Sequence, residues 1–570
     1  MCVSRLTLLT LLLCIVASPL VTHARAEDGS VPLHQRIDDL IAAGTDGYAT
    51  IVSDLSTDEE IVRRLYLDLC GRIPTSTQTL AFLNHDDQDK RRQLIDQLLK
   101  SPEHVRHLQH RLDVLLMQRR PKKYIDVELW RQYLFDSLLQ NKPWDVLTRE
   151  MLTADGVDKD ERVRARFLLN RELNADETTR DLGRVFLGRD MQCAQCHDHP
   201  SILDYEQVHY FGLNAFLNRS YLFTDPKTQQ KVIAEKAEGT VKFTSVFTSV
   251  EGETAPRMLH LPPLVDPTPD QEPYVTKPDK KAGGIPKYSR RLLLADAITD
   301  PANRAFQLNI ANRLWAMMMG RGLVEPLDMF HSDNPPSHPE ILDLLAESLT
   351  EQEFDMRWLI REIALSRTYQ LSSNIKDGTS SPPEQYTRGL MKPLSPEQLS
   401  WSVMQACGVV ETSRHKAVAK LAKDDPQAKP DTAGHSVQLE LQLELELQLE
   451  SLVNNDLTPH VEHFVKIFAS ANESSRFDAT ANQALFVLNG DLITNWLKPA
   501  NGYLTTRLTE QTDVDEIVNE FYLCLLNRRA TAADSQALTE FLQGDEEERS
   551  AAIQQAIRSV LCSAEFRFNH

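Results

Sequence analysis

The chain has 570 residues, a formal net charge of −20, and contents of 41% hydrophobic and 25% charged residues. This length is enough for two or three domains with sizeable cores, and the composition is that of a globular protein. An acidic chain without a basic stripe repels the phosphate backbone, which excludes nucleic acid as a partner.

Residues 1–26 have the three parts of an export signal. Arg5 supplies positive charge, residues 6–17 form an apolar run too short to span a bilayer comfortably, and Ala24-Arg25-Ala26 fits a cleavage site. The alternative is a retained N-terminal anchor. We therefore expect a periplasmic or secreted protein with no transmembrane span after signal cleavage.

Residues 27–222 are predicted to form an N-terminal helical domain. Apolar residues at helical spacing and helix start and stop residues predict helices at 33–48, 57–71, from 74 onward, 90–99, 105–116, 126–140, 143–152, 175–188 and 205–217. The aromatic residues of the last helix suit either the wall of a porphyrin site or an ordinary core, and we favour the core.

Residues 191–200 read M-Q-C-A-Q-C-H-D-H-P, and within them Cys193, Cys196 and His197 form C-x-x-C-H. This pattern is typical of covalent haem attachment. Two thiols three residues apart project from one helical turn and can add to the two vinyl groups of one porphyrin. The histidine that follows is then placed to ligate the iron. The motif therefore predicts a haem c cofactor.

Other interpretations of the same motif stay open. The two thiols suit a redox or structural disulfide, or the segment is an inert turn. With His197, Asp198 and His199 nearby, Cys193 and Cys196 also suit a zinc or non-haem iron site.

A sixth iron ligand is not evident. Met258 and His209 are candidates without supporting spacing, and we expect both to be structural. An open sixth position would favour ligand binding or peroxidase-like chemistry over plain electron transfer.

Four cysteines of the mature chain lie outside the motif: Cys70, Cys407, Cys524 and Cys562. In an oxidising compartment they can form disulfides, and otherwise they are buried free thiols. Because Cys524 and Cys562 lie on helical segments that can pack antiparallel, we predict this pair first.

Residues 223–288 are predicted to form a β-containing, proline-rich insertion. Residues 240–247 are β-branched and aromatic and predict a strand. Seven prolines between 262 and 286 exclude long helices there. Helices return in a partner domain, at residues 289–423 and again at 456–570.

A low-complexity segment at residues 424–455 separates those two parts. Residues 424–434 are predicted to be a flexible loop. In residues 437–452 leucine alternates with Glu or Gln, a period that favours a strand, although these residue types favour a helix. The sequence leaves both states open.

Similar sequences occur near the two ends of the chain. Residues 62–69 align with residues 518–525, and Arg72 and Thr75 match Arg528 and Thr531. Residues 98–103 resemble residues 560–565, each closing on Ser-x-Glu. Amphipathic helices resemble one another by default, but these shared positions predict a duplicated helical hairpin module.

A second polar cluster lies in a stretch punctuated by Pro and Gly. It comprises Asn312, Arg313, Arg321, Asp328, Asn334, Ser337 and His338. The cluster suits a hydrolytic or metal site. We favour a rigid turn in which Ser337 is the N-cap of a helix that begins near Pro339.

Together these motifs resemble an exported planctomycete family, cytochrome-like, with two paired domains of unknown function. Residues 64–75 and 193–200 resemble its N-terminal domain, and residues 312–315, 320–326, 334–340, 365–372 and 563–566 its partner domain. The resemblance implies a CxxCH-bearing domain followed by a helical one. Met329 departs from an acidic residue more usual in the family after Asp328, and His209 stands at a variable position.

We predict a mainly α fold, with two helical domains, a small β-containing insertion between them, and a helical hairpin module repeated near the two ends. The predicted function is that of an exported c-type-cytochrome-like protein, which exchanges electrons with a redox partner protein. The alternatives are an exported metal-dependent enzyme acting on a polysaccharide or other envelope substrate, and a non-catalytic surface scaffold. Whether the protein is an enzyme is left open.

Overall fold

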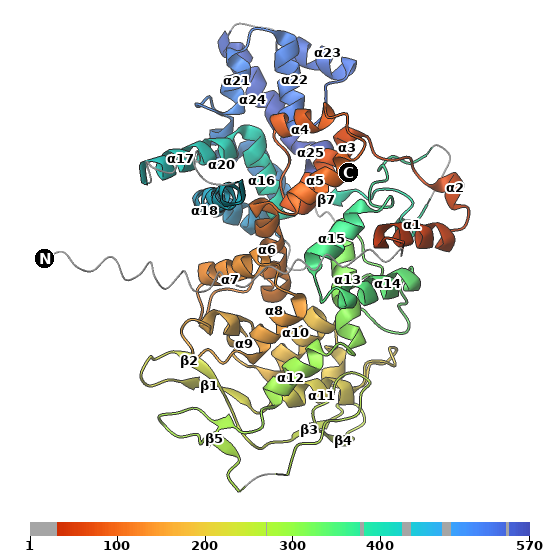
Figure 1. The fold of residues 1–570 in the computed structure, drawn as a ribbon, viewed down its shortest axis with the longest axis vertical. Coiled ribbons are helices and arrows are strands. Elements are labelled where there is room, and N and C mark those ends of the chain that lie inside the picture. Colours follow the sequence, from red (N-terminus) through yellow and green to blue (C-terminus); the bar gives the residue numbers. More distant parts are fainter. Residues whose placement is uncertain (1–30, 269–270, 377–380, 425–434, 470–479, 543–545) are drawn as a thin grey trace, which may run out of the picture.

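The computed structural model describes residues 31–268, 271–376, 381–424, 435–469, 480–542 and 546–570. The predicted signal at residues 1–26 lies outside the described residues, and so does the loop predicted at 424–434 except for Asp424, which is the last residue of a helix. As predicted, the fold is mainly α, and its strands form only small two-stranded sheets (Figure 1).

The helices of the first half confirm the predicted ones to within a few residues. The predicted helix at 33–48 is divided, because the chain turns at Gly47, whose φ is 68°. The elements are α1 (Leu33–Gly44), α2 (Tyr48–Ile51), α3 (Asp58–Cys70), α4 (Ser76–Leu83), α5 (Lys90–Leu98), α6 (Pro102–Met117), α7 (Val127–Leu139), α8 (Trp144–Thr153), the 3-10 turn η1 (Arg162–Ala165), α9 (Arg166–Asn170), α10 (Ala175–Leu187), the 3-10 turn η2 (Cys193–Gln195) and α11 (Gln207–Leu217).

The strands form four antiparallel pairs. These are β1 (Ser220–Thr224) with β2 (Lys231–Glu235), β3 (Val241–Thr244) with β4 (Glu251–Thr254), β5 (Tyr274–Thr276) with β6 (Ile285–Pro286), and β7 (Lys392–Pro393) with β8 (Phe568–Asn569). The strand predicted at 240–247 is β3, which ends at Thr244 because Ser245 begins the turn to β4. The first three pairs lie at the end of the molecule opposite α21–α24 (Figure 1).

The described part of the second half is mainly helical from residue 290 onward. Its elements are α12 (Arg290–Thr299), α13 (Arg304–Met319), α14 (Pro339–Glu351), α15 (Met356–Leu365), the 3-10 turn η3 (Pro383–Gln385), α16 (Pro396–Cys407), α17 (Val409–Asp424), α18 (His435–Phe468), α19 (Ala481–Asn489), α20 (Asp491–Leu497), α21 (Leu504–Glu510), α22 (Val514–Leu525), α23 (Ala532–Phe541), α24 (Glu546–Cys562) and α25 (Ala564–Arg567). None of the described helices combines the length and apolar character that a membrane span requires.

The alternating segment at 437–452 is helical and belongs to α18. A helix cannot bury every second residue, so Leu443 and Leu445 are each 46% exposed, whereas Leu449 is buried. Glu450 is buried too, because it pairs with Arg106 of α6 at 2.8 Å. The helix-forming composition of the segment therefore outweighs its alternation.

Two hydrophobic clusters form the interior. The first runs from α1 to Tyr386 and unites α8 and α10 with α13, for example through the stacked rings of Trp144 and Phe306, 6.4 Å apart. The second extends over residues 399–566 and also takes Leu67 of α3 and Ile73. The domain boundaries expected from the sequence stay predictions.

The predicted repeat appears as two modules, α3–α6 and α22–α25, with matching helix caps. The Thr75 side chain accepts from the backbone of Gln78 at the start of α4, and Thr531 caps α23 in the same way. Ser101 caps α6, and Ser563 caps α25. Side-chain caps satisfy backbone N–H groups that have no partner inside the helix.

The two modules also share an ion pair at matching positions. Arg72 donates to Glu103 at 2.8 Å, and Arg528 donates to Glu565 at 2.6 Å. In each module the arginine follows the first helix and the glutamate follows the serine cap. This agreement in contacts, beyond agreement in sequence, supports a duplication.

Helix α3 lies where the two modules meet, and residues 60–70 of it are all buried. Arg63 donates to the Asn527 side chain at 2.8 Å and to the Phe566 carbonyl at 2.8 Å. Asn569 donates to Asp68 at 2.8 Å, and the C-terminus lies beside α3 in Figure 1. Residues 566–570 therefore close over a helix near the start of the chain.

The predicted Cys524–Cys562 disulfide is wrong, since the six described cysteines are free thiols. Cys524 accepts from Arg507 at 3.5 Å and lies near Cys407. Cys562 lies in the last turn of α24, near Arg567. The two helices pack, but these cysteines face different neighbours.

Candidate functional site

The CxxCH motif lies in a tight turn just after α10. That helix ends at Gly188, whose φ of 65° suits a glycine C-cap. Cys193 begins the 3-10 turn η2, and its carbonyl accepts from the backbone of Cys196 at 3.2 Å and of His197 at 3.4 Å. Ala194 is buried and anchors the turn, while both thiol-bearing residues are exposed.

His197 is held in a defined orientation. Its Nδ1 lies 2.7 Å from the carbonyl oxygen of Asp198. A carbonyl only accepts, so this contact assigns the ring proton to Nδ1 and leaves the Nε2 lone pair for a ligand. The Phe247 ring lies 4.4 Å from the His197 ring, and the Val246 backbone donates to the Cys196 carbonyl at 3.0 Å. The β3–β4 turn thus packs against the motif.

Asp198 and His199 stabilise the loop that follows. Asp198 accepts from the backbone of Gln207 at 2.8 Å, at the first residue of α11. His199 Nδ1 accepts from the backbone of Ile202 at 2.9 Å and of Ser201 at 3.3 Å. Over the described ranges, no three His, Cys, Asp or Glu side chains are grouped so that they could hold a metal ion.

The attachment atoms fit a covalent haem. Cys193 and Cys196 present two exposed thiols from one turn, and His197 follows with its Nε2 available. A hydrogen bond from Nδ1 to a carbonyl is the usual support for a histidine that ligates a metal. Cys193, Cys196 and His197 are therefore the residues of this chain that would hold the group.

The two candidate sixth ligands lie in or beside the core. Met258 is 5% exposed and belongs to the first hydrophobic cluster. His209 is 8% exposed, donates from Nδ1 to the Asp204 carbonyl at 3.2 Å, and packs its ring 4.7 Å from that of His260. Both side chains have structural neighbours.

Asn312 and Arg313 of the second polar cluster support the backbone. The Asn312 amide donates to the Val324 carbonyl at 2.9 Å and accepts from the Val324 N–H at 3.1 Å. Arg313 donates to the Arg184 carbonyl at 2.7 Å. These contacts join α13 to the loop after it and to α10.

The remaining residues of that cluster do not form one site. Arg321 accepts through its carbonyl from the Tyr386 hydroxyl at 3.3 Å, and Asp328 lies 3.8 Å from the Arg184 guanidinium. Burial lowers the pKa of His338. His338, rather than Ser337, is the N-cap of α14, because Pro339 occupies the first helical position and the Ser337 N–H donates to Leu323.

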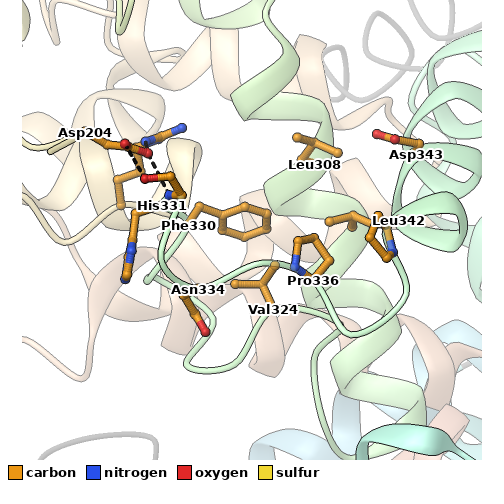
Figure 2. A pocket seen from close by; sticks show the side chains of 12 residues that line it. Asp204, Leu308, Val324, Phe330, His331, Asn334, Pro336, Leu342 and Asp343 are labelled. Carbon is orange, nitrogen blue, oxygen red and sulfur yellow. Dashed lines mark hydrogen bonds and ion pairs between the residues drawn. The ribbon is translucent and has the colours of Figure 1, made fainter. Parts of the chain in front are cut away.

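Asn334 of this cluster lines a cavity that has a volume of about 360 Å³ (Figure 2). Arg189, Asp204, Phe330 and His331, which the sequence reasoning missed, line it as well. Two backbone hydrogen bonds create it by joining the chain before the Cys motif to the loop before α14: Asp190 N to Asp328 O at 2.7 Å, and Phe330 N to Gly188 O at 3.1 Å. Nothing local in the sequence marks such long-range pairing.

Comparison with known proteins gives two matches to protein families. Residues 36–221 match the family model PSCyt2, described as a protein of unknown function (DUF1549). Residues 290–542 match PSD1, described as a protein of unknown function (DUF1553). The chain thus carries two paired domains of unknown function, in agreement with the paired architecture that the resemblance implied. Curated proteins and solved structures gave no match.

Proposed function

We propose that this two-domain chain is an exported c-type-cytochrome-like protein. In this proposal Cys193 and Cys196 hold haem covalently, His197 ligates its iron, and the protein exchanges electrons with a redox partner protein. The supporting observation is the CxxCH turn itself, which presents two exposed thiols beside an imidazole whose Nδ1 is bonded to a carbonyl. Bound haem would supply a one-electron couple at its iron.

The thiols can make the attachment without an oxidant. Each thiol adds across one vinyl group, so that sulfur bonds one carbon and the thiol hydrogen goes to the other. Cys193 and Cys196 are exposed and have free Sγ atoms, whereas Cys70 and Cys407 are buried, and burial raises the pKa of each of these two to about 12. The motif cysteines are therefore the accessible nucleophiles.

The turn between β3 and β4 provides an apolar neighbour. Val246 and Phe247 are 64% and 76% exposed, and both contact the motif. Exposed apolar side chains beside two thiols suit contact with the flat apolar face of a porphyrin. Residues 1–26 support export, which delivers the chain to a compartment where c-type cytochromes are made.

The test is expression with the native signal in a host that matures c-type cytochromes, followed by a haem stain after denaturing electrophoresis. The wild type should keep covalent haem, and Cys193→Ser/Cys196→Ser should lose it. Cys562→Ser is the matched control, because Cys562 is a half-buried cysteine outside the motif. A single substitution should leave one vinyl group free and shift the pyridine haemochrome spectrum.

A colourless protein from this host would overturn the proposal. Stoichiometric zinc or iron without porphyrin would then support the metal-dependent enzyme. A metal-free protein would support the surface scaffold.

A further inference from the structure

A cavity of about 360 Å³ lies close to the CxxCH turn and contains none of its residues. One end is polar, with Asp204 and His331 side by side, and Asp343 lies at the opposite end (Figure 2). Between them the wall is apolar, formed by Leu308, Val324, Phe330 and Leu342 among others. The shape offers a polar end to one functional group and an apolar surface to the rest of a ligand.

The polar end has hydrogen-bond donors without acceptors. The Arg189 side chain is 15% exposed, and burial lowers the pKa of its guanidinium. Its Nε and Nη1 are buried and have no hydrogen-bond partner in the described part of the chain. His331 Nδ1 is buried and also lacks such a partner there, and it is a further donor in the tautomer that carries the proton on Nδ1. Buried donors of this kind cost free energy, which an incoming acceptor would recover.

The carboxylate of Asp204 does not serve as the missing hydrogen-bond acceptor of Arg189. Asp204 accepts from the Ser332 hydroxyl and from the Ser332 N–H, both at 2.8 Å (Figure 2). Its nearest approach to Arg189 is an ion pair of 3.9 Å, longer than a hydrogen bond. Burial acts to raise the pKa of Asp204, but the Ser332 hydrogen bonds and the Arg189 charge outweigh it and lower the pKa.

The charges limit the class of ligand. Asp204 stays ionised at neutral pH, so the polar end of the cavity holds one positive and one negative charge. Arg189 attracts one negative charge of a ligand, and Asp204 repels a second one, which disfavours a dianion. At the far end Asp343 pairs with Arg304. A single carboxylate attached to a compact apolar body matches both the donors and the walls.

We propose that this cavity binds a small monocarboxylate, with Arg189 and His331 donating to the carboxylate and Phe330 and Leu308 packing against its apolar body. The site stands on residues other than Cys193, Cys196 and His197, so it does not depend on haem attachment. The apolar body of the ligand is either aromatic or short-chain aliphatic, and benzoate and butyrate distinguish these two classes.

The experiment is isothermal titration calorimetry of the full chain with four probes: benzoate, butyrate, benzamide and inorganic phosphate. Benzoate or butyrate should bind with a Kd on the order of 1 mM or tighter. Benzamide has the shape of benzoate without the charge and should not bind measurably. Phosphate should bind more weakly than the carboxylates.

Two variants test the site independently. Arg189→Gln removes the cation and should weaken binding by about tenfold or more. Leu308→Trp fills the apolar part from α13 and should have a similar effect without touching the polar end. Arg131→Gln is the matched control, because Arg131 is a partly buried arginine that pairs with Asp113 and Glu128, and none of these three residues lines the cavity. The affinity of this variant should match that of the wild type.

Circular dichroism identifies a variant that fails to fold. If Arg189→Gln does not fold, the affinity of Leu308→Trp decides whether the cavity is the binding site. Four results would overturn the proposal: benzamide binding as well as benzoate, tighter binding of phosphate, unchanged affinity in the folded variants, or no binding up to ~10 mM carboxylate.

Discussion

The pair formed by Arg106 and Glu450 allows a sharp test of the helix assigned to the Leu/Glu/Gln segment. The two side chains are 3% and 7% exposed and lie 2.8 Å apart, and Arg106 also donates to the Cys70 carbonyl and stacks 3.8 Å from the Trp401 ring. Burial raises the pKa of Glu450 and lowers the pKa of Arg106. Each charged form is therefore costly to bury and depends on its partner.

The expected magnitudes follow from this burial. Glu450→Leu leaves the Arg106 charge buried without its partner, and Arg106→Met leaves the Glu450 charge, so each should lower the free energy of unfolding by about 3–5 kcal/mol. The double variant places two apolar side chains in contact. It should lie within about 2 kcal/mol of the wild type, which gives a coupling energy of at least ~4 kcal/mol.

The assay is urea unfolding followed by tryptophan fluorescence, with the four proteins of the cycle measured together. Glu444→Leu is the matched control, because Glu444 is an exposed glutamate of the same helix, and its effect should stay within about 0.5 kcal/mol. If Glu450→Leu behaves like Glu444→Leu, or if the two single effects add, then Glu450 does not face Arg106 and the helical register of α18 is wrong.

Three further predictions concern the remainder of the chain. Burial lowers the pKa of His104 to about 4, below the value of about 6.5 in an unfolded chain, so the contribution of His104 to stability is complete above pH 6.5 and falls by roughly 3 kcal/mol on acidification to pH 4. Burial lowers the pKa of His107 and His110 as well, so His104→Gln should reduce the pH slope in urea titrations without abolishing it, and equal slopes would contradict this. Gly188→Ala should cost about 1–3 kcal/mol in thermal unfolding, because a Cβ there would lie 2.7 Å from a neighbouring ring, whereas Gly47→Ala, equally left-handed but 3.4 Å from its nearest atom, should cost less. In haem-free protein, maleimide should label Cys193 and Cys196 fastest, and equal labelling of the buried thiols would show that the turn is not exposed.

Features that depend on a few consecutive residues could be predicted from the sequence. The caps at Thr75 and Thr531 need only a threonine and a suitable residue three positions later, so the repeat could be recognised from the sequence alone. Gly71 and Asn527, at equivalent positions, both adopt a left-handed conformation, with φ of 70° and 59°. Gly and Asn are the residues that most readily adopt it.

Features that depend on distant segments could not be predicted. The cavity exists because residues 188–190 pair with residues 328–330, and neither segment has a strand pattern of its own. Arg189 and His331 became candidates only when this pairing left their nitrogens buried without acceptors among the described residues. The error over Cys524 has the same origin, because helix packing alone does not say which faces meet.

The closure of residues 566–570 over α3 affects how the chain is made. A ribosome synthesises Arg63 before its acceptor at Phe566, and 503 positions separate the two. At ~5–20 residues per second, about 25–100 s of elongation pass in between. Throughout that time Arg63 lacks its acceptor at Phe566 and α3 lacks the segment that covers it, so the final packing of α3 forms only after residues 566–570 have been synthesised.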